Sequence, residues 1–365
     1  MFENPTKTPE APPSANRVPE SADDPILVNA YCTCGDVAKP NFPHVLHGQR
    51  TLDDPELKTH LGGFFGYVQN RGNGHMTQTR YHVLRHIQRT RQQWSFSIGS
   101  AHLHALAEWA SRANALIFLP DGNVRDPQGR ILIASADGSS DPLAKVPYPP
   151  GAWLRKSRSE ALISQYGLHV PAYLPPLVSE PELRLRDAGS IAERALGVFI
   201  AALRAESLAS DTPIGIDEMR DRMPAAFDHM SPEELNFMAG TEPAAEDVAK
   251  FGWRYEGLFV LLWALGMTDD LPFPQAICDA SQIAATMLEL DAEVFMRTAR
   301  TRPAGEILDA LDLHYRLHWV IRQTRVNEEE EPESLNGSVI HERHYALNWL
   351  IQFEDCEWDN VDTPT

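Results

Sequence analysis

Two pairs of histidines have spacings at which imidazole side chains could share a metal ion. His314 and His318 lie four residues apart on the apolar face of a predicted helix, where a nearby carboxylate would complete a ligand set. Because no HExxH pattern accompanies them, buried histidines bonded to a carboxylate are the alternative interpretation. His341 and His344, on the outward side of the last predicted helix, give a weaker metal signal.

A second candidate metal site combines cysteines and histidines near the N-terminus. Cys32 and Cys34 share one face of an extended strand, and His44 and His47 follow them along the chain. Zinc accepts two thiolates with two imidazoles, although C-x-C differs from the usual C-x2-C spacing. The alternative is a pair of small buried thiols with two loop histidines. We therefore expect no cofactor, with zinc at one of these two sites as the alternative.

The stretch WRYEGLFVLLWALG, residues 253–266, predicts a helix that is apolar on all sides and central to a helical bundle. Arg254 and Glu256 are the two charged residues in it, and they lie about 200° apart around the helix axis. Side chains at that angle cannot pair with each other. Glu256, which shares a face with Phe259 and Trp263, therefore needs a partner from another helix.

The last predicted helix, residues 339–353, carries an arginine within its apolar face. That face consists of Val339, Ala346, Leu347, Leu350 and Phe353. The opposite face, which we expect to meet solvent, consists of His341, His344, Asn348 and Gln352. A buried charge without a partner is strongly destabilising, so Arg343 requires a carboxylate. We expect Glu256 to supply it, with Asp312 or Glu342 as alternatives.

A further ion pair is predicted within one helix, because Asp312 and Arg316 are four residues apart. The predicted ionic cluster is then made of Glu256, Asp312, Arg316, Glu342 and Arg343. Buried ionisable groups of this kind are enriched at functional sites but also occur as structural networks. The cluster is thus a candidate binding site or a structural feature of the core.

The formal net charge of −19 is distributed unevenly along the chain. Residues 1–155 contain 15 Lys and Arg against 14 Asp and Glu, whereas residues 156–365 contain 17 against 37. Between Glu56 and Glu108 there is no acidic residue, but there are five arginines and six histidines. Nucleic-acid binding needs a net positive surface, so the charge argues against it outside that local basic region.

The first part of the chain predicts a tail followed by a small α/β domain. Residues 1–25 are rich in Pro, Ala, Ser and Glu without periodicity, so we expect a disordered tail. In residues 26–135, ILVNAY and SFSI predict strands, residues 101–112 predict a helix, and ALIFLP with RILIA predicts a hairpin. The conformation of residues 80–90 stays open, because YHVLRHIQRT, residues 81–90, fits a strand or a helix equally.

Residues 136–156 are punctuated by Gly, Ser and Pro and predict a linker between two domains. Beyond it, residues 157–365 predict a mainly helical domain that ends with helices at about residues 303–325 and 339–353. Two Ser and Glu pairs have capping-box spacing, namely Ser190 with Glu193 and Ser231 with Glu234.

Targeting and redox signals point to the cytoplasm. The N-terminal residues lack the apolar core of a signal peptide, and the longest apolar run, residues 257–267, is too short to cross a bilayer. Four unevenly placed cysteines do not form a disulfide framework, which agrees with a reducing compartment. We expect a cytoplasmic protein without a membrane segment.

Three tryptophan-bearing blocks follow one another in the second half: WRYEGLFVLLWALG, RPAGEILDALDLHYRLHW and HERHYALNWL, the last followed by WDNVDTPT. With these blocks, residues from about 155 to 362 resemble the family known as domain of unknown function 4272. The resemblance implies a mainly helical fold, to which some members add an N-terminal α/β region, and it implies no activity or catalytic residue. The fold class predicted is α+β, a small N-terminal α/β domain followed by a mainly α-helical domain.

The sequence contains no GxSxG, Walker, GxGxxG or protein-kinase motif. We therefore expect a non-catalytic protein-binding factor, of an immunity or stress type in a bacterium, whose acidic helical domain meets a protein partner. The alternative is an enzyme, metal-dependent in one form, whose site is made of Glu256, Asp312, His314, His318 and Arg343.

Overall fold

The chain divides into two compact units, of which the first ends at Pro149 and the second begins at Pro150. The computed structural model describes residues 24–210 and 212–365, so all but the last two residues of the predicted 1–25 tail lie outside the described residues. The predicted linker, residues 136–156, contains the boundary between the units. Its last residues are helical, because α4 (Pro150–Gln165) begins at a proline, which is well suited to a helix start.

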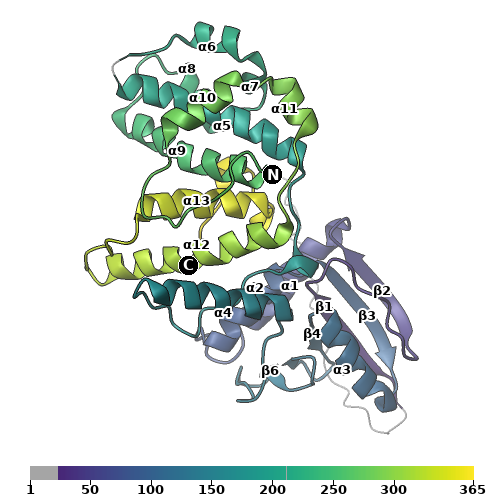
Figure 1. Ribbon diagram of the computed structural model, residues 1–365. Helices are drawn as coiled ribbons and strands as arrows, with labels where there is room; N and C mark the ends of the chain where they lie inside the picture. Colours follow the sequence, from purple (N-terminus) through teal and green to yellow (C-terminus); the bar gives the residue numbers. More distant parts are fainter. Residues whose placement is uncertain (1–23, 211) are drawn as a thin grey trace, which may run out of the picture. The chain divides into compact units, whose positions relative to one another are not determined.

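An antiparallel sheet forms the centre of the first unit (Figure 1). Its strands are β1 (Ile26–Cys32), β2 (Val45–Thr51), β3 (Gln92–Ile98), β4 (Ala115–Phe118), β5 (Val124–Arg125) and β6 (Ile131–Ile133). They lie in the order β2-β3-β1-β4-β5-β6. The central strand β1 places Ala30 opposite Trp94 of β3 and Ile117 of β4. The strands predicted from ILVNAY and SFSI are β1 and the second half of β3.

The two faces of the sheet carry separate cores, because successive side chains of a strand point to opposite sides. The helices of this unit are α1 (Pro55–Gln69), α2 (Gln78–Gln88) and α3 (Leu103–Arg112). Ala30 and Cys32 pack with Trp109 of α3 on one face. Tyr31 packs with Phe64 of α1 on the other face, in a core that α2 also joins. The predicted helix at residues 101–112 is therefore the element that covers one side of the sheet.

Several features of this unit were left open, missed or wrongly predicted from the sequence. The segment left open between strand and helix forms α2. The predicted hairpin of ALIFLP with RILIA is wrong, because the turn-rich segment between them contributes β5, which lies between β4 and β6. The helix α1 was not predicted, since Gly62, Gly63 and Gly66 weaken its helical signal.

A buried carboxylate organises the turn between β5 and β6. Asp126 is fully buried and accepts hydrogen bonds from the backbone N–H groups of Gln128, Arg130 and Lys145 at 3.0, 2.9 and 3.2 Å. The Nε of Arg130 donates to the same carboxylate at 2.8 Å. One side chain therefore closes the turn and ties it to the segment that follows β6.

The second unit is built from helices. They are α4, α5 (Ala188–Ala209), α6 (Ile216–Arg222), α7 (Pro224–Asp228), α8 (Pro232–Ala239), α9 (Ala245–Ala264), α10 (Ala280–Glu289), α11 (Ala292–Thr298), α12 (Ala304–Val326) and α13 (Gly337–Leu350). The longer ones stack in the order α5, α9, α13, α12 and α4, each in contact with the next (Figure 1). None of the described helices is long and apolar enough to cross a lipid bilayer.

Helix starts in this unit follow local capping chemistry. The capping box predicted at Ser231 and Glu234 is present at the start of α8. At α5 the prediction is wrong, because Asp187 is the capping residue and accepts a hydrogen bond from the backbone N–H of Ser190 at 3.0 Å. A carboxylate is as good an acceptor for these N–H groups as a hydroxyl, and the helix begins earlier for that reason.

Helix α13 is covered on two sides, because it lies between α9 and α12. The solvent-facing side predicted for it is therefore wrong at His344 and Asn348, which are 1% and 4% exposed. His341 is exposed as predicted, and Gln352 lies beyond the end of the helix in left-handed backbone. A helical wheel with one buried face does not describe a helix with neighbours on both sides.

Replacement of Asp126 tests how much its carboxylate stabilises the turn between β5 and β6. Asp126→Ala leaves three backbone N–H groups and a guanidinium nitrogen without their acceptor, so we expect the first unit to lose about 2 kcal/mol or more of stability. Native-state hydrogen exchange of amides in β4–β6 measures this free energy. The exposed Asp53→Ala is the matched control and should change it by less than about 0.5 kcal/mol. Equal protection in both variants would contradict the role given to Asp126.

Candidate functional site

The ion pair predicted between Glu256 and Arg343 is present between α9 and α13. Arg343 Nε donates to Glu256 Oε2 at 2.9 Å, and the two side chains are 1% and 2% exposed. Each side chain also has a backbone partner: the N–H of Cys278 donates to Glu256 Oε1 at 2.5 Å, and Arg343 Nη1 donates to the carbonyl of Pro272 at 2.7 Å. The pair therefore also fixes the segment between α9 and α10.

A second ion pair joins the same two helices. Arg254 Nη1 donates to Glu342 Oε2 at 3.0 Å, with side chains 7% and 12% exposed. The guanidinium carbon lies 4.4 Å from the ring centre of Tyr345 and 5.7 Å from that of Trp358. Glu342 was an alternative partner for Arg343, and it pairs with Arg254 instead. Arg254 and Glu256 of α9 thus have separate partners, both on α13.

The third ion pair lies within α12. Arg316 donates to both carboxylate oxygens of Asp312, from Nε at 2.8 Å and from Nη2 at 2.9 Å, and neither side chain is more than 1% exposed. Arg316 Nη2 also donates to the carbonyl of Pro175 at 3.1 Å, and Nη1 lies 3.7 Å from Glu160 of α4. Asp312 is therefore the partner of Arg316, at the contact between α12 and α4. The five residues of the predicted cluster form separate ion pairs and do not meet at one place.

The carboxylates in these pairs already accept hydrogen bonds from arginines within the protein. A carboxylate acts as a base or a nucleophile only when a substrate can reach it. Glu256, Asp312 and Glu342 each accept a hydrogen bond from an arginine, and their side chains are between 1% and 12% exposed. This geometry is typical of a structural ionic network.

His314 and His318 of α12 and His344 of α13 form a buried group around one direct contact. His318 Nδ1 and His344 Nδ1 are 3.0 Å apart, so one ring donates a hydrogen bond to the other. The ring of His341 stands edge-on to His318, with centres 5.4 Å apart. His314 instead uses Nδ1 to contact the carbonyl of Ala310 at 2.8 Å. The pair predicted as metal ligands, His314 and His318, thus has partners within the protein.

Burial makes these imidazoles difficult to protonate. It lowers the pKa of His314 to about 3, with a smaller effect from the charge of Arg343. The pKa of His318 is lowered to about 4 by burial and then by the positive charges of His341, Arg322 and Arg325. Burial, and then the neighbouring His318, His314 and His341, lower the pKa of His344 well below its usual value. These rings are neutral at pH 7.

The thiol and imidazole side chains of the second proposed metal site are not brought together. In the part of the chain that the structure describes, no three His, Cys, Asp or Glu side chains are placed to hold a metal ion. Cys32 lies in the core beneath α3, and Cys34 Sγ contacts the carbonyl of Arg112 at 3.8 Å. His44 contacts the carbonyl of Phe42 at 2.8 Å.

Strand order explains why His47 is separated from the cysteines. His47 lies on β2, where its Nε2 is 2.7 Å from Ser97 Oγ of β3. Because β3 lies between β2 and β1, His47 and Cys32 are two strands apart in the sheet. The alternative interpretation placed both histidines in a loop, and the strand β2 was not predicted.

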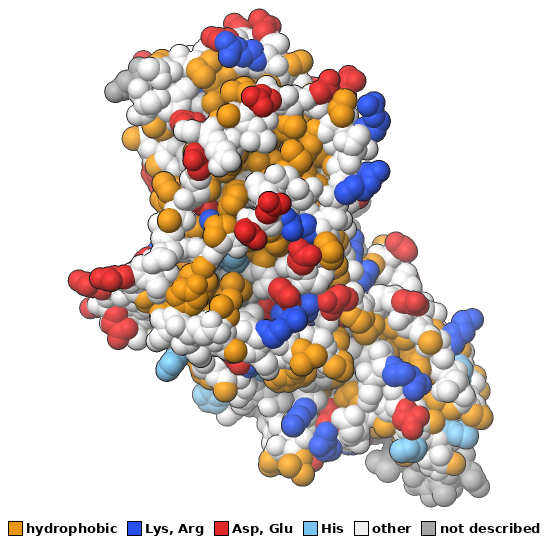
Figure 2. All heavy atoms as spheres, in the orientation of Figure 1, with side chains coloured by type: hydrophobic (Ala, Val, Ile, Leu, Met, Phe, Trp, Pro, Cys, Tyr) orange, Lys and Arg blue, Asp and Glu red, His pale blue; other side chains and the backbone are white. Residues whose placement is uncertain are grey.

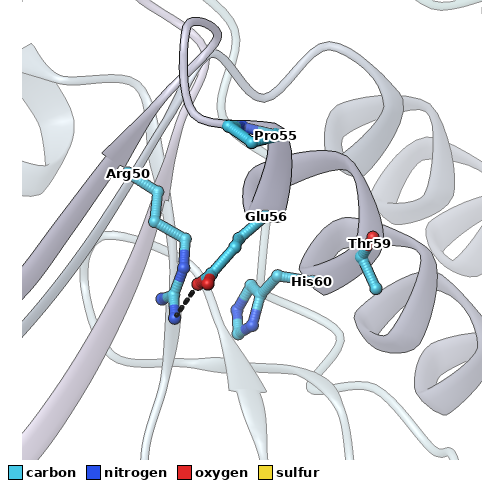
Figure 3. Close-up of a pocket in the computed structure, with 5 residues that line it drawn as sticks. All are labelled: Arg50, Pro55, Glu56, Thr59 and His60. Atoms are coloured by element: carbon cyan, nitrogen blue, oxygen red, sulfur yellow. Dashed lines mark ion pairs between the residues drawn. The ribbon is translucent and has the colours of Figure 1, made fainter.

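The first unit contains a pocket that sequence reasoning missed. It has a volume of about 430 Å³, lies between β2 and α1, and is lined by Arg50, Pro55, Glu56, Thr59 and His60 (Figure 3). Arg50 Nη2 is 3.5 Å from Glu56 Oε2. Burial, and then the charge of Arg50, lowers the pKa of His60. One sequence signal for this pocket was available. Asp54 and Pro55 are typical of a helix start, and they follow Arg50 of β2 closely in the chain.

Comparison with known protein families gives one match, which lies in the second unit. The family model for Domain of unknown function (DUF4272) matches residues 155–361, which is more than half of the chain, and the chain belongs to this family. No curated protein and no solved structure matched it. The matched region contains all three ion pairs and the histidine group, and it does not include the sheet or the pocket of the first unit.

The lowered histidine pKa values predict acid sensitivity. A histidine that is neutral in the folded state takes up a proton on unfolding below about pH 6.5, so the unfolded chain binds more protons there. The free energy of unfolding therefore falls as pH drops from about 6.5 towards 4, the pKa of folded His318. We expect His344→Gln to lose less stability over this window than the wild type.

Urea unfolding followed by helical circular dichroism at several pH values measures this slope. His169→Gln, which replaces an exposed histidine of the same unit, is the control and should keep the wild-type slope. Identical slopes for the wild type and His344→Gln would contradict the assignment of acid sensitivity to the buried group.

Proposed function

We propose that the chain is a non-catalytic, cytoplasmic protein-binding factor, of an immunity or stress type in a bacterium, whose acidic helical unit binds a protein with a basic surface. Charge distribution is the observation that carries the proposal. Residues 150–365 contain 37 Asp and Glu against 18 Lys and Arg, whereas residues 1–149 contain 14 of each. A field of one sign speeds the encounter with a partner of opposite charge and disfavours partners of like charge.

The connection between α12 and α13 supports the proposal as a contact surface. Acidic side chains project where this connection lies at the edge of the helical unit (Figure 2). Glu328, Glu329 and Glu330 are exposed in succession, and Val326 beside them is 76% exposed. An apolar side chain rimmed by charges is a common arrangement in protein interfaces.

The neighbouring Glu331 stabilises the connection through hydrogen bonds within the protein. It accepts hydrogen bonds from Arg325 Nη2 at 2.7 Å and from the backbone N–H of Gly337 at 3.1 Å. Glu331 therefore holds the connection in place at the start of α13. The three glutamates before it can be changed without loss of this contact.

The engaged carboxylates favour this proposal over the enzyme alternative. Glu256 and Asp312 would need to release Arg343 and Arg316 before they could act on a substrate, and separation of such a buried pair is strongly unfavourable. The histidine group is likewise held by contacts within the core. A structural role for these residues leaves the acidic surface as the feature available to a partner.

Neutralisation of the acidic connection tests the proposal. The triple variant Glu328→Gln, Glu329→Gln and Glu330→Gln should weaken binding of a partner by about tenfold, since each exposed charge pair contributes roughly 0.2–1 kcal/mol. A partner is first captured by the immobilised chain and then purified, and its Kd is measured for wild type and variant at two salt concentrations. The loss should shrink at high salt, where surface charges are screened.

The control carries the same change in charge elsewhere in the helical unit: Asp217→Asn, Asp221→Asn and Glu246→Gln. These side chains are away from the α12–α13 connection along the chain, and their replacement should change Kd by less than about threefold. Equal affinity of wild type and the connection variant would contradict the proposal. So would turnover of a substrate by the purified chain that is lost in Glu256→Gln.

A further inference from the structure

The pocket of the first unit is large enough for a small organic molecule. Its volume of about 430 Å³ falls in the range of small-ligand sites, which is about 300–1,000 Å³. Arg50 reaches it from β2, and Glu56 and His60 reach it from α1 (Figure 3). It lies outside the family-matched region and is independent of the acidic surface.

Arg50 has two partners: a hydrogen bond to Gln93 holds its guanidinium in place, and its ion pair with Glu56 is weak. Its Nη1 donates to Gln93 Oε1 on β3 at 2.9 Å, which fixes the plane of the guanidinium. Its Nη2 faces Glu56 at 3.5 Å, longer than a charge-assisted hydrogen bond of about 2.7–2.9 Å. The Glu56 side chain is 74% exposed, whereas that of Arg50 is 32% exposed. Glu56 can therefore swing into solvent and leave a positioned guanidinium in the pocket.

His60 provides a rigid and neutral wall. Its Nε2 is 3.1 Å from the hydroxyl of Tyr31, and the two rings stack with centres 5.8 Å apart. Tyr31 is in turn stacked on Phe64 at 4.0 Å between ring centres and is buried in the core. These contacts fix the imidazole, so the pocket combines one cation with the flat surfaces of His60 and Pro55.

We propose that this pocket binds a small organic carboxylate. The ligand carboxylate replaces Glu56 at Arg50, and the body of the ligand lies against His60 and Pro55. The charge of the pocket selects this class: once Glu56 is displaced, the lining offers one positive charge, which matches a carboxylate monoanion. A phosphate dianion carries a second negative charge, and the lining offers no second lysine or arginine to balance it.

Titration of the full-length protein with benzoate tests the proposal, and benzamide is the neutral probe of the same shape. The readout is the ring resonance of His60 in histidine-labelled protein, assigned by its loss in His60→Gln. Benzoate should shift it with saturation, and benzamide and inorganic phosphate should bind at least about tenfold more weakly. Absence of saturable benzoate binding, or equal binding of benzamide or phosphate, would overturn the proposal.

Two variants separate ligand binding from folding. Arg50→Gln should weaken benzoate binding by about tenfold or more, because it removes the charge-assisted hydrogen bonds. Glu56→Gln should tighten it by about threefold or more, because the competing carboxylate is lost, and a misfolded protein does not gain affinity. Lys58→Gln is the control, since it changes the charge of α1 outside the lining, and it should alter affinity by less than about twofold. Weaker binding in Glu56→Gln would overturn the proposal.

Discussion

A carboxylate and a guanidinium enclosed between apolar helices depend on each other. Glu256 and Arg343 are removed from water in the middle of the helical stack, and either charge alone would remain buried without compensation. Their pairing fixes the contact of α9 with α13 at one register. Because Glu256 Oε1 and Arg343 Nη1 also bond to the backbone at Cys278 and Pro272, the same pair positions the chain that leaves α9.

The rest of the helical unit is organised around that contact. Arg254 and Glu342 join the same helices a short distance along them, and Asp312 with Arg316 stabilises α12 where it meets α4. The neutral histidines fill the space between α12 and α13. Polar groups that satisfy one another in this way specify one arrangement of helices, whereas apolar packing alone permits several. The apolar core of the family-matched region therefore contains a few paired polar groups, and its surface carries the acidic charge.

Helical periodicity was sufficient to predict the pair at the centre of this unit. Glu256 and Arg343 each stand on an apolar face, and elimination left few partners for them. Periodicity could not predict the burial of His344 and Asn348, because the number of neighbours around α13 is a property of the whole stack. It also could not predict the pocket at Arg50, which requires the pairing of β2 with β3 and the return of α1 beside it. Long-range strand order has no signature in local spacing.

A double-mutant cycle on Glu256 and Arg343 tests the central claim most directly. Glu256→Gln keeps an oxygen for the backbone N–H of Cys278, and Arg343→Met replaces the guanidinium by an apolar chain of similar length. Native-state hydrogen exchange of α9 amides in the full-length protein gives the free energy of opening for each variant. We predict that Arg343→Met alone loses about 3–5 kcal/mol, and that the double variant is more stable than the sum of the single losses by at least about 2 kcal/mol. Additive losses within about 0.5 kcal/mol would contradict the account.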